Sequence, residues 1–269
     1  MAGTPLTDAI NALTTYSNTV TGASDTTLSE AVATLAAGYG GGGVDWSAVA
    51  IGTEPDGAIT LNFGNNKNFR TAAFRGCTKL TSVTVGTFPT AWDTPGDVFY
   101  GCTALASFDF GQIGRIGGSW FRDCSALTHV ESTSVVRLNG TYIFQNSGIV
   151  RACFPNLTGL TGRAFESATH LELADIGSAD TVQANLFNND GALRTLIIRR
   201  STMASLNSWS SSCLGGIYSN PTASTIYVPS SLVSTYQSGT LWADAYNAGV
   251  TFTALEGSPY ENPTWYENA

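Results

Sequence analysis

Apolar and polar positions follow a repeating pattern along the middle of the chain. A phenylalanine recurs at intervals of 25, 22, 23, 21 and 22 residues, at Phe74, Phe99, Phe121, Phe144, Phe165 and Phe187. A leucine or valine follows six positions later, and mostly apolar residues follow at nine and eleven. Such a spacing is typical of a solenoid, whose units bury their apolar faces only by stacking on one another.

The pattern predicts an α/β solenoid with one short parallel strand in each repeat of about 22 residues. Side chains alternate along a strand, so offsets nine and eleven face inward and the leucine and phenylalanine fill the space behind them. An irregular or 3₁₀ segment with turn formers returns the chain, which gives a right-handed coil. Offset three is small in five units (Cys77, Cys102, Cys124, Ser147, Ala168), which indicates a tight corner where a thiol faces a backbone carbonyl; we expect Asp190, the sixth, to turn outward.

Three units share the motif F-x-x-C-x-x-L-x-x-V-x-V most closely: AFRGCTKLTSVTV, VFYGCTALASFDF and WFRDCSALTHVES. This motif resembles the BspA-like leucine-rich repeat family, which implies a solenoid over residues 44–229. The fourth unit departs from it at the cysteine and has Val150 at the leucine position. The segment after Ile226 and Val228 resembles the family's closing segment, which implies a capping helix within residues 230–258, followed by a tail at 259–269.

Residues 1–43 form a different module. The sequence predicts two short helices, the second opened by a capping box at Thr27–Glu30, and a glycine linker at Gly40–Gly43. The segment resembles the N-terminal segment of some bacteriophage and prophage tail or baseplate proteins. The resemblance implies anchoring to other virion proteins and a homo-oligomer, although the helices could instead cap the solenoid or be an ordinary surface-protein leader.

The composition of the chain limits the kinds of partner that it can bind. The chain has 269 residues, a formal net charge of −8 and only 12 lysines and arginines, which argues against binding nucleic acid or anionic membranes. It has no apolar run of the roughly 18 residues that span a bilayer, and its first ten residues do not read as a secretory signal. We therefore expect buried thiols rather than disulfides, and with no C-x-x-C pair we expect neither a metal site nor a cofactor.

Offsets eight and ten should point outward and bring polar groups onto one strand face. The candidates there are Asp109, His129, Glu131, Phe154 and Asp175, which together could bind the hydroxyls and faces of sugars, although Phe154 could equally pack under a loop. Adjacent rungs are ~4.8 Å apart, so Asp109 and Glu131 could also approach the ~5 Å spacing of a retaining glycosidase pair, but a plain solvated face explains them as well.

Aromatic residues in loops add Trp92 and Tyr100 as further candidates for ligand contact. Taken together, the residues predict a non-enzymatic adhesion or receptor-binding protein. The preferred interpretation is a phage tail or baseplate component of a virion that contacts a bacterial surface glycan or protein. The alternatives are a bacterial cell-surface leucine-rich-repeat adhesin and a polysaccharide-cleaving solenoid enzyme.

Overall fold

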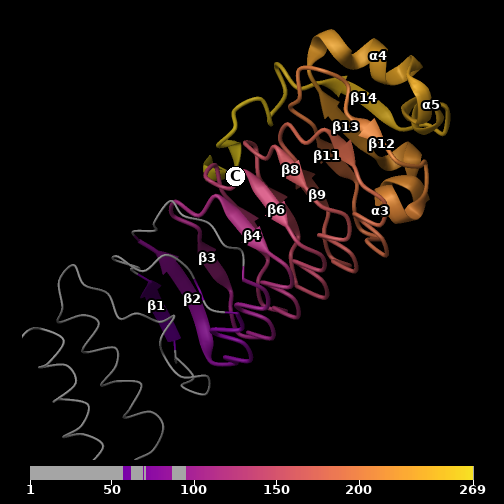
Figure 1. Cartoon of the computed structure of the whole chain (residues 1–269). Helices are drawn as coiled ribbons and strands as arrows, with labels where there is room; N and C mark the ends of the chain where they lie inside the picture. The colour runs from indigo at the N-terminus through magenta and orange to yellow at the C-terminus, as the bar shows by residue number, and fades with distance from the viewer. Residues whose placement is uncertain (1–56, 62–68, 70, 87–94, 269) are drawn as a thin grey trace, which may run out of the picture.

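The repeats stack into an elongated coil that rises one rung per repeat (Figure 1). The computed structural model describes residues 57–61, 69, 71–86 and 95–268, so residues 1–43 and Trp92 lie outside the described residues. A row of parallel strands runs along the coil. Its members are β1 (Gly57–Leu61), β2 (Leu80–Val85), β3 (Ser107–Asp109), β5 (His129–Glu131), β7 (Arg151–Cys153), β9 (Leu173–Asp175), β11 (Thr195–Ile197), β13 (Thr225–Val228) and β14 (Thr251–Ala254).

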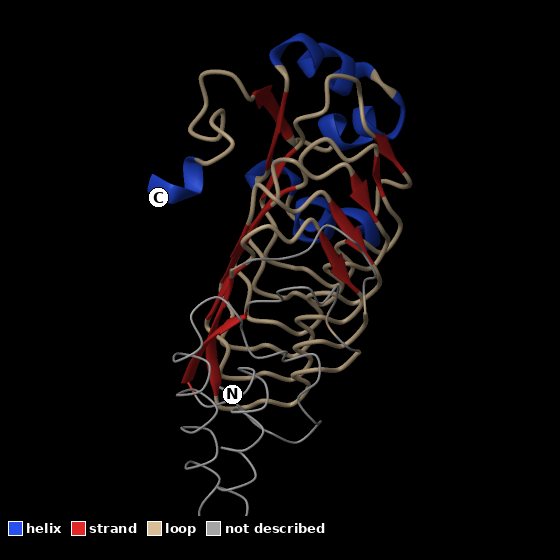
Figure 2. Ribbon diagram, turned by 60° about the vertical axis from the view of Figure 1, so that its left-hand side comes forward, coloured by secondary structure: helices blue, strands red, loops and turns tan. Residues whose placement is uncertain are grey.

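A second row of strands, which the sequence did not predict, lies on another side of the coil (Figure 2). In each of its strands an apolar residue that lies in the core follows an outward position. The row comprises β4 (Arg115–Gly117), β6 (Arg137–Asn139), β8 (Gly159–Leu160), β10 (Thr181–Val182) and β12 (Ser205–Leu206). The first row and this second row therefore form two outer surfaces, and the phenylalanine-bearing turns close the third, which we call the return side.

The recurring phenylalanines form the continuous stack that the sequence predicts. Successive rings lie parallel within 16°, with centroids 5.2 to 5.7 Å apart, from Phe74 to Phe187. In every unit the residues two positions before and two positions after the phenylalanine have a positive φ, so two left-handed turns hold each ring in place. Glycine occupies only Gly76 and Gly101 among these twelve positions.

The small residue at offset three lines a corner behind the stack. The thiols of Cys102 and Cys124 donate to the carbonyls of Phe74 and Phe99, at 3.0 and 3.2 Å, as the sequence predicts. Asp190 occupies the same corner in the sixth unit, and the prediction that it turns outward is wrong. It is completely buried, and neither carboxylate oxygen has a hydrogen-bond partner among the described residues. Burial is the main reason that the pKa of Asp190 rises to about 9.

The fourth unit is one residue shorter between its phenylalanine and its strand. His129 therefore pairs with Arg151 and Val130 with Ala152, and Ile149 rather than Val150 fills the leucine position in the core. This slip reverses the faces that the sequence predicts for the strand, because a one-residue shift exchanges inward and outward side chains. All five cysteines of the chain are buried, and none of them forms a disulfide.

Helices cover the C-terminal end of the coil. They are α3 (Ser211–Ser219), α4 (Val233–Ser238) and α5 (Thr240–Asn247), with the short 3₁₀ segments η1 (Pro221–Ala223) and η2 (Ser230–Leu232) between them. Tyr236 and Trp242 are buried, and each bonds to the backbone of Ala204, which ties the helices to the last rungs. None of the described helices is long and apolar enough to cross a lipid bilayer.

The chain then turns back along the coil. Residues 258–268, which we call the tail and which end in η3 (Trp265–Asn268), run from the helical end toward the middle of the molecule (Figure 1). They lie outside the first row of strands (Figure 2).

Candidate functional site

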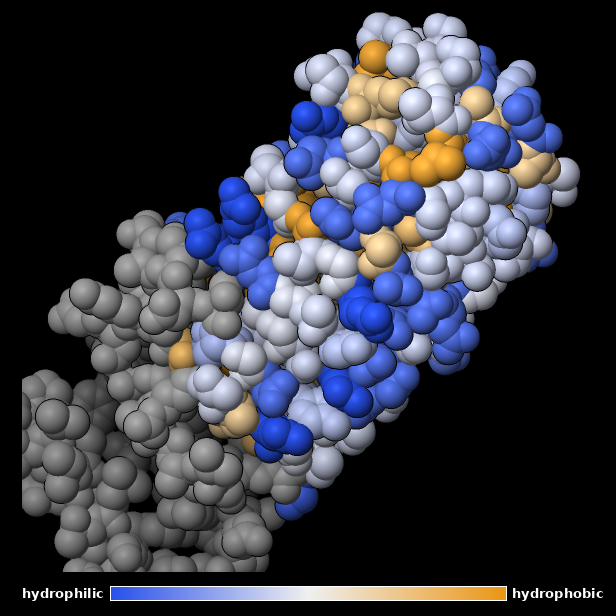
Figure 3. All heavy atoms as spheres, turned by 45° about the vertical axis from the view of Figure 1, so that its right-hand side comes forward, coloured by the Kyte–Doolittle hydropathy of each residue, from blue (hydrophilic) through white to orange (hydrophobic). Residues whose placement is uncertain are grey.

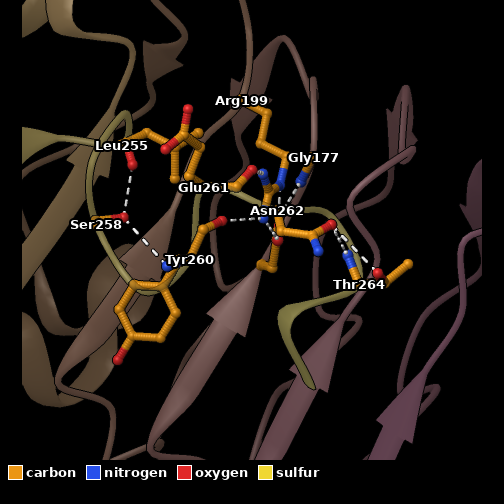
Figure 4. Close-up of polar contacts among 9 residues, drawn as sticks. Gly177, Arg199, Leu255, Ser258, Tyr260, Glu261, Asn262 and Thr264 are labelled. Carbon is orange, nitrogen blue, oxygen red and sulfur yellow. Dashed lines mark hydrogen bonds and ion pairs between the residues drawn. The ribbon is translucent and has the colours of Figure 1, made fainter. Parts of the chain in front are cut away.

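The predicted binding strip lies on the first row of strands, and the tail covers much of it. Arg199, which follows β11, donates to the backbone carbonyls of Tyr260 and Glu261 at 2.8 and 3.1 Å (Figure 4). The Tyr260 ring packs on Tyr227 with centroids 4.7 Å apart, and the Arg151 guanidinium lies 5.2 Å from the centre of the Trp265 ring. We call the part of this row from β7 to β13 the tail-covered face.

Short local bonds fold the tail into the shape that this contact requires. The Ser258 hydroxyl donates to the carbonyl of Leu255 at 2.6 Å and accepts from the amide of Tyr260 (Figure 4). The Glu261 carboxylate accepts from the amide of Gly257, and the side-chain oxygen of Asn262 accepts from the backbone amide of Thr264. These turns are typical of serine, asparagine and glycine, and they present Tyr260 and Trp265 to the strands.

Asp175 belongs to this covered region and is not available to a ligand. Its carboxylate is buried, forms an ion pair of 2.7 Å with Arg199 and accepts the amide of Gly177 at 3.0 Å. Burial raises the pKa of the Asp175 carboxyl, while the Arg199 guanidinium opposes that rise. The predicted alternation along the strand is therefore correct for Asp175, but the sequence does not indicate that the tail covers this position.

Phe154 is also placed wrongly by the sequence. It is completely buried, and its ring lies 6.1 Å from that of Phe144 and 6.0 Å from that of Phe110. Because the fourth unit is shorter by one residue, Phe154 occupies the inward position that Ile176 holds in the next unit. It therefore stabilises the core and cannot contact a ligand.

Three candidates remain on the uncovered part of this row, and each already has a local role or neighbour. Asp109 is exposed, and its carboxylate accepts the amide of Gly111 at 2.9 Å, in the same Asp-x-Gly turn that Asp175 makes. A side chain at Gly111 would collide with the backbone of β2, which explains the glycine. His129 is exposed beside Thr128, and Glu131 is paired with Arg151. Both carboxylates of the proposed glycosidase pair are thus held by other groups.

Tyr100 lies on the return side, within a ladder of alternating arginine and tyrosine. The Arg75 and Arg122 guanidiniums lie 4.5 and 5.3 Å from the centre of its ring. The ladder continues through Tyr142 to Arg163, which pairs with Glu166 at 2.9 Å. Stacked repeats bring the arginines and tyrosines of the ladder together although neighbours in it are 20 or more positions apart in sequence. The Tyr100 ring is half-buried against arginines, so it is less accessible than the loop prediction implies.

The second row of strands carries the functional side chains that the sequence analysis missed. Arg115 on β4 and Arg137 on β6 lie on the outer side of this row, and they are register partners in the pair of strands. The position two residues after the start of β6, β8, β10 and β12 is polar in every case. The residues there are Asn139, Thr161, Gln183 and Asn207. No acidic residue occurs in β4, β6, β8, β10 or β12. We call this surface the open face, because no described segment bonds across its arginine pair.

The described residues contain no cluster of histidine, cysteine, aspartate or glutamate that could hold a metal ion. The polar side chains instead form rows along the coil, one residue per rung. Figure 3 shows one side of the molecule, where hydrophilic residues dominate and the apolar patches are small and separate. The geometry of these rows favours contact with an extended ligand over enclosure of a small one.

Comparison with known proteins defines first the class and then the family. The fold is that of a leucine-rich repeat protein, and the model of the BspA type leucine rich repeat region matches in six copies, over residues 58–172 and 93–214. These ranges cover more than half of the chain, so the chain belongs to the BspA type leucine rich repeat family. No curated protein matches the chain significantly.

Three solved structures match the chain at low identity. A leucine rich repeat protein from T. pallidum is 18% identical, with a TM-score of 0.48, and the match covers 73% of this chain and 85% of that one. A leucine-rich repeat protein from Bacteroides ovatus is 15% identical, with a TM-score of 0.47 and coverage of 76% and 61%. A leucine rich cell surface protein from Faecalibacterium prausnitzii is 10% identical, with a TM-score of 0.32 and coverage of 78% and 85%.

Proposed function

We propose that this chain is a non-enzymatic binding protein that holds an extended ligand of a bacterial surface, a glycan or a protein, along the outside of its coil. One observation carries the proposal: the stacked repeats fill the interior with the phenylalanine stack and aliphatic residues, and they align exposed polar side chains in rows along the outside. A ligand that crosses several rungs can then make one contact per repeat, and such contacts add up.

The setting that we favour is a bacterial cell surface, where the chain would act as an adhesin. The phage tail or baseplate interpretation depends on residues 1–43 alone, and the family match begins at residue 58. Anchoring through residues 1–43 and homo-oligomer formation remain predictions about that segment. The enzymatic alternative has less support, because Glu131 is bound to Arg151 and Asp109 to its own turn.

A binding assay with product analysis tests this function. The full-length protein is applied to an array of bacterial surface glycans and to intact bacterial cells, and each bound glycan is then incubated with the protein and analysed for cleavage. We expect retention of an extended glycan or of cells, without release of shorter products. Cleavage that is lost in Asp109→Asn or Glu131→Gln would overturn the non-enzymatic function, and absence of any binding would overturn the adhesive one.

A further inference from the structure

Two arginines on the open face have no partner among the described residues. Arg115 and Arg137 form no ion pair and no side-chain hydrogen bond in the described part of the chain. The other described arginines all have partners. Five form ion pairs (Arg75, Arg122, Arg151, Arg163, Arg199), and Arg194 and Arg200 donate to backbone carbonyls.

The two unpartnered arginines are also neighbours. Arg115 on β4 pairs in register with Arg137 on β6, so their side chains leave the same side of adjacent rungs. Adjacent parallel strands are about 4.8 Å apart, and like charges at directly opposed positions repel each other. In a chain with a net charge of −8 and 20 acidic residues, two adjacent arginines without a carboxylate are an arrangement that an anion would complete.

The next rung is shaped to accommodate one of these side chains. Gly159 on β8 is the register partner of Arg137, and the Arg137 side chain lies over it. A Cβ at Gly159 would come within 2.9 Å of Nη1 and 3.0 Å of Cγ of Arg137. The absence of a side chain there thus allows the guanidinium to lie along the face instead of extending into solvent.

The residues beside the pair add neutral hydrogen-bonding groups. Asn139 follows Arg137 with one inward residue between them, so it points to the same side. Its amide and that of Gln183, two rungs further along the coil, make no side-chain hydrogen bond among the described residues, although both residues are half-buried. Amides bind hydroxyl groups through both donor and acceptor atoms, whereas arginine binds carboxylates through paired N–H groups.

We propose that the open face binds an acidic polysaccharide, with Arg115 and Arg137 holding a carboxylate of the sugar chain and Asn139 and Gln183 its hydroxyls. This inference rests on the proposed function and names the ligand class and the surface that it uses. Two arginines match a sugar chain of moderate charge, since the overall negative charge of the protein would repel a dense polyanion.

Affinity measurements on the full-length protein test the site. The probes are hyaluronan, a chain with carboxylates on alternate sugars, then dextran as a neutral chain, dextran sulfate as a dense polyanion, and sodium acetate as a free carboxylate. We expect hyaluronan to bind more tightly than the other three and to weaken as salt is added, because exposed charge pairs are screened. Binding of dextran alone, or equal binding of acetate, would overturn the site but leave the proposed function intact.

Variants locate the contact. The double change Arg115→Gln and Arg137→Gln should weaken hyaluronan binding at least tenfold. The control Arg75→Gln with Arg122→Gln changes the net charge equally on the return side and should leave affinity within twofold. Equal losses in the two double variants, or no loss in the first, would overturn the proposal.

Gly159→Ala supplies a test without any change of charge. Its methyl group would displace the Arg137 side chain, so affinity should fall severalfold while the fold is retained by circular dichroism. Asp93 occupies the repeat position of Arg115 one unit earlier, outside the described residues; Asp93→Asn should leave affinity equal or higher. Unchanged affinity in Gly159→Ala, or weaker binding in Asp93→Asn, would contradict the arrangement.

Discussion

The two rows of strands arise from the same repeat, yet they present opposite kinds of surface. On the tail-covered face, charged groups are matched within the chain: Asp175 pairs with Arg199, Arg151 pairs with Glu131 of the neighbouring strand β5, and the tail contacts both arginines. On the open face, Arg115 and Arg137 lie side by side, and no described carboxylate pairs with either of them. Outward alternation along a strand therefore does not by itself indicate a binding surface, because a distant segment can return and cover it.

The largest expected effect separates the buried from the exposed candidates of the first row. Phe154→Ala should destabilise the protein by roughly 3–5 kcal/mol, because it empties a site between Phe144 and Phe110 in the core. His129→Ala, on the neighbouring rung, should change stability by less than about 0.5 kcal/mol. Thermal and denaturant unfolding measure both. A small effect at Phe154 would restore the outward prediction and with it the original binding strip.

Sequence spacing predicts the structure correctly where the repeat is exact and incorrectly where a unit is one residue shorter. The spacing of the phenylalanines and the small residue at offset three sufficed to predict the stack and the thiol-lined corner. The sequence misplaces Phe154 because the fourth unit has one residue fewer before β7. Ile149 and Val150 are adjacent and both apolar, so the sequence alone does not show which of them fills the leucine position. The second row of strands contributes a single buried apolar residue per rung, such as Ile116 or Leu138, which is too short a signal for a strand.

Contacts between distant segments account for the remaining errors. Nothing near Asp175 in sequence indicates that Tyr260 and Glu261 return to meet its partner Arg199. The sequence does not single out Arg115 and Arg137 for the same reason: whether an arginine has a partner depends on residues that are distant in sequence.

The ion pair beneath the tail should be the most sensitive polar contact of the covered face. Arg199→Ala leaves the Asp175 carboxylate buried without its cation and removes two bonds to the tail. We expect a loss of about 3 kcal/mol, within the range for removing one member of a buried pair. Arg200→Ala, at the adjacent position, removes no ion pair of the described residues; it is the control and should cost less than about 1 kcal/mol. Similar losses from the two variants in denaturant unfolding would show that the buried pair is unimportant.

Removing the tail should expose the covered face to solvent, as the open face already is. Deletion of residues 258–269 takes away the Tyr260 and Trp265 contacts, and we expect a loss of about 2 kcal/mol from partial re-exposure of apolar surface. Cys153, which is buried on this face, should then react with a thiol reagent under native conditions. Cys153→Ser in the shortened chain identifies the reacting thiol. A shortened chain whose thiols stay protected would indicate that something other than the tail buries Cys153.

Asp190, on the return side, should make the free energy of unfolding depend on pH. Its pKa is about 9 in the folded protein and about 3.9 when unfolded. Below about pH 4 both states are protonated. Between pH 4 and 9 only the unfolded state releases the proton, so the free energy of unfolding falls as pH rises. Asp190→Asn removes this slope and should therefore raise the free energy of unfolding at pH 8.

Denaturant unfolding of the wild type and Asp190→Asn at pH 4 and pH 8 measures the difference. The two proteins should agree at pH 4 and diverge at pH 8. Parallel pH profiles would show that Asp190 titrates normally and is therefore accessible to water.

The smallest effect concerns the open face and has the opposite sign from that on the covered face. Arg115→Gln with Arg137→Gln should leave stability unchanged or raise it by up to about 0.5 kcal/mol, because adjacent like charges repel each other and no internal bond is lost. In low salt the gain should be largest, since screening reduces the repulsion. Melting temperatures at two salt concentrations measure it, with Arg151→Gln on the covered face as the matched arginine that should lower stability. A clear loss of stability in the double variant would mean that Arg115 and Arg137 serve the fold, and the open face would then have no charge reserved for a ligand.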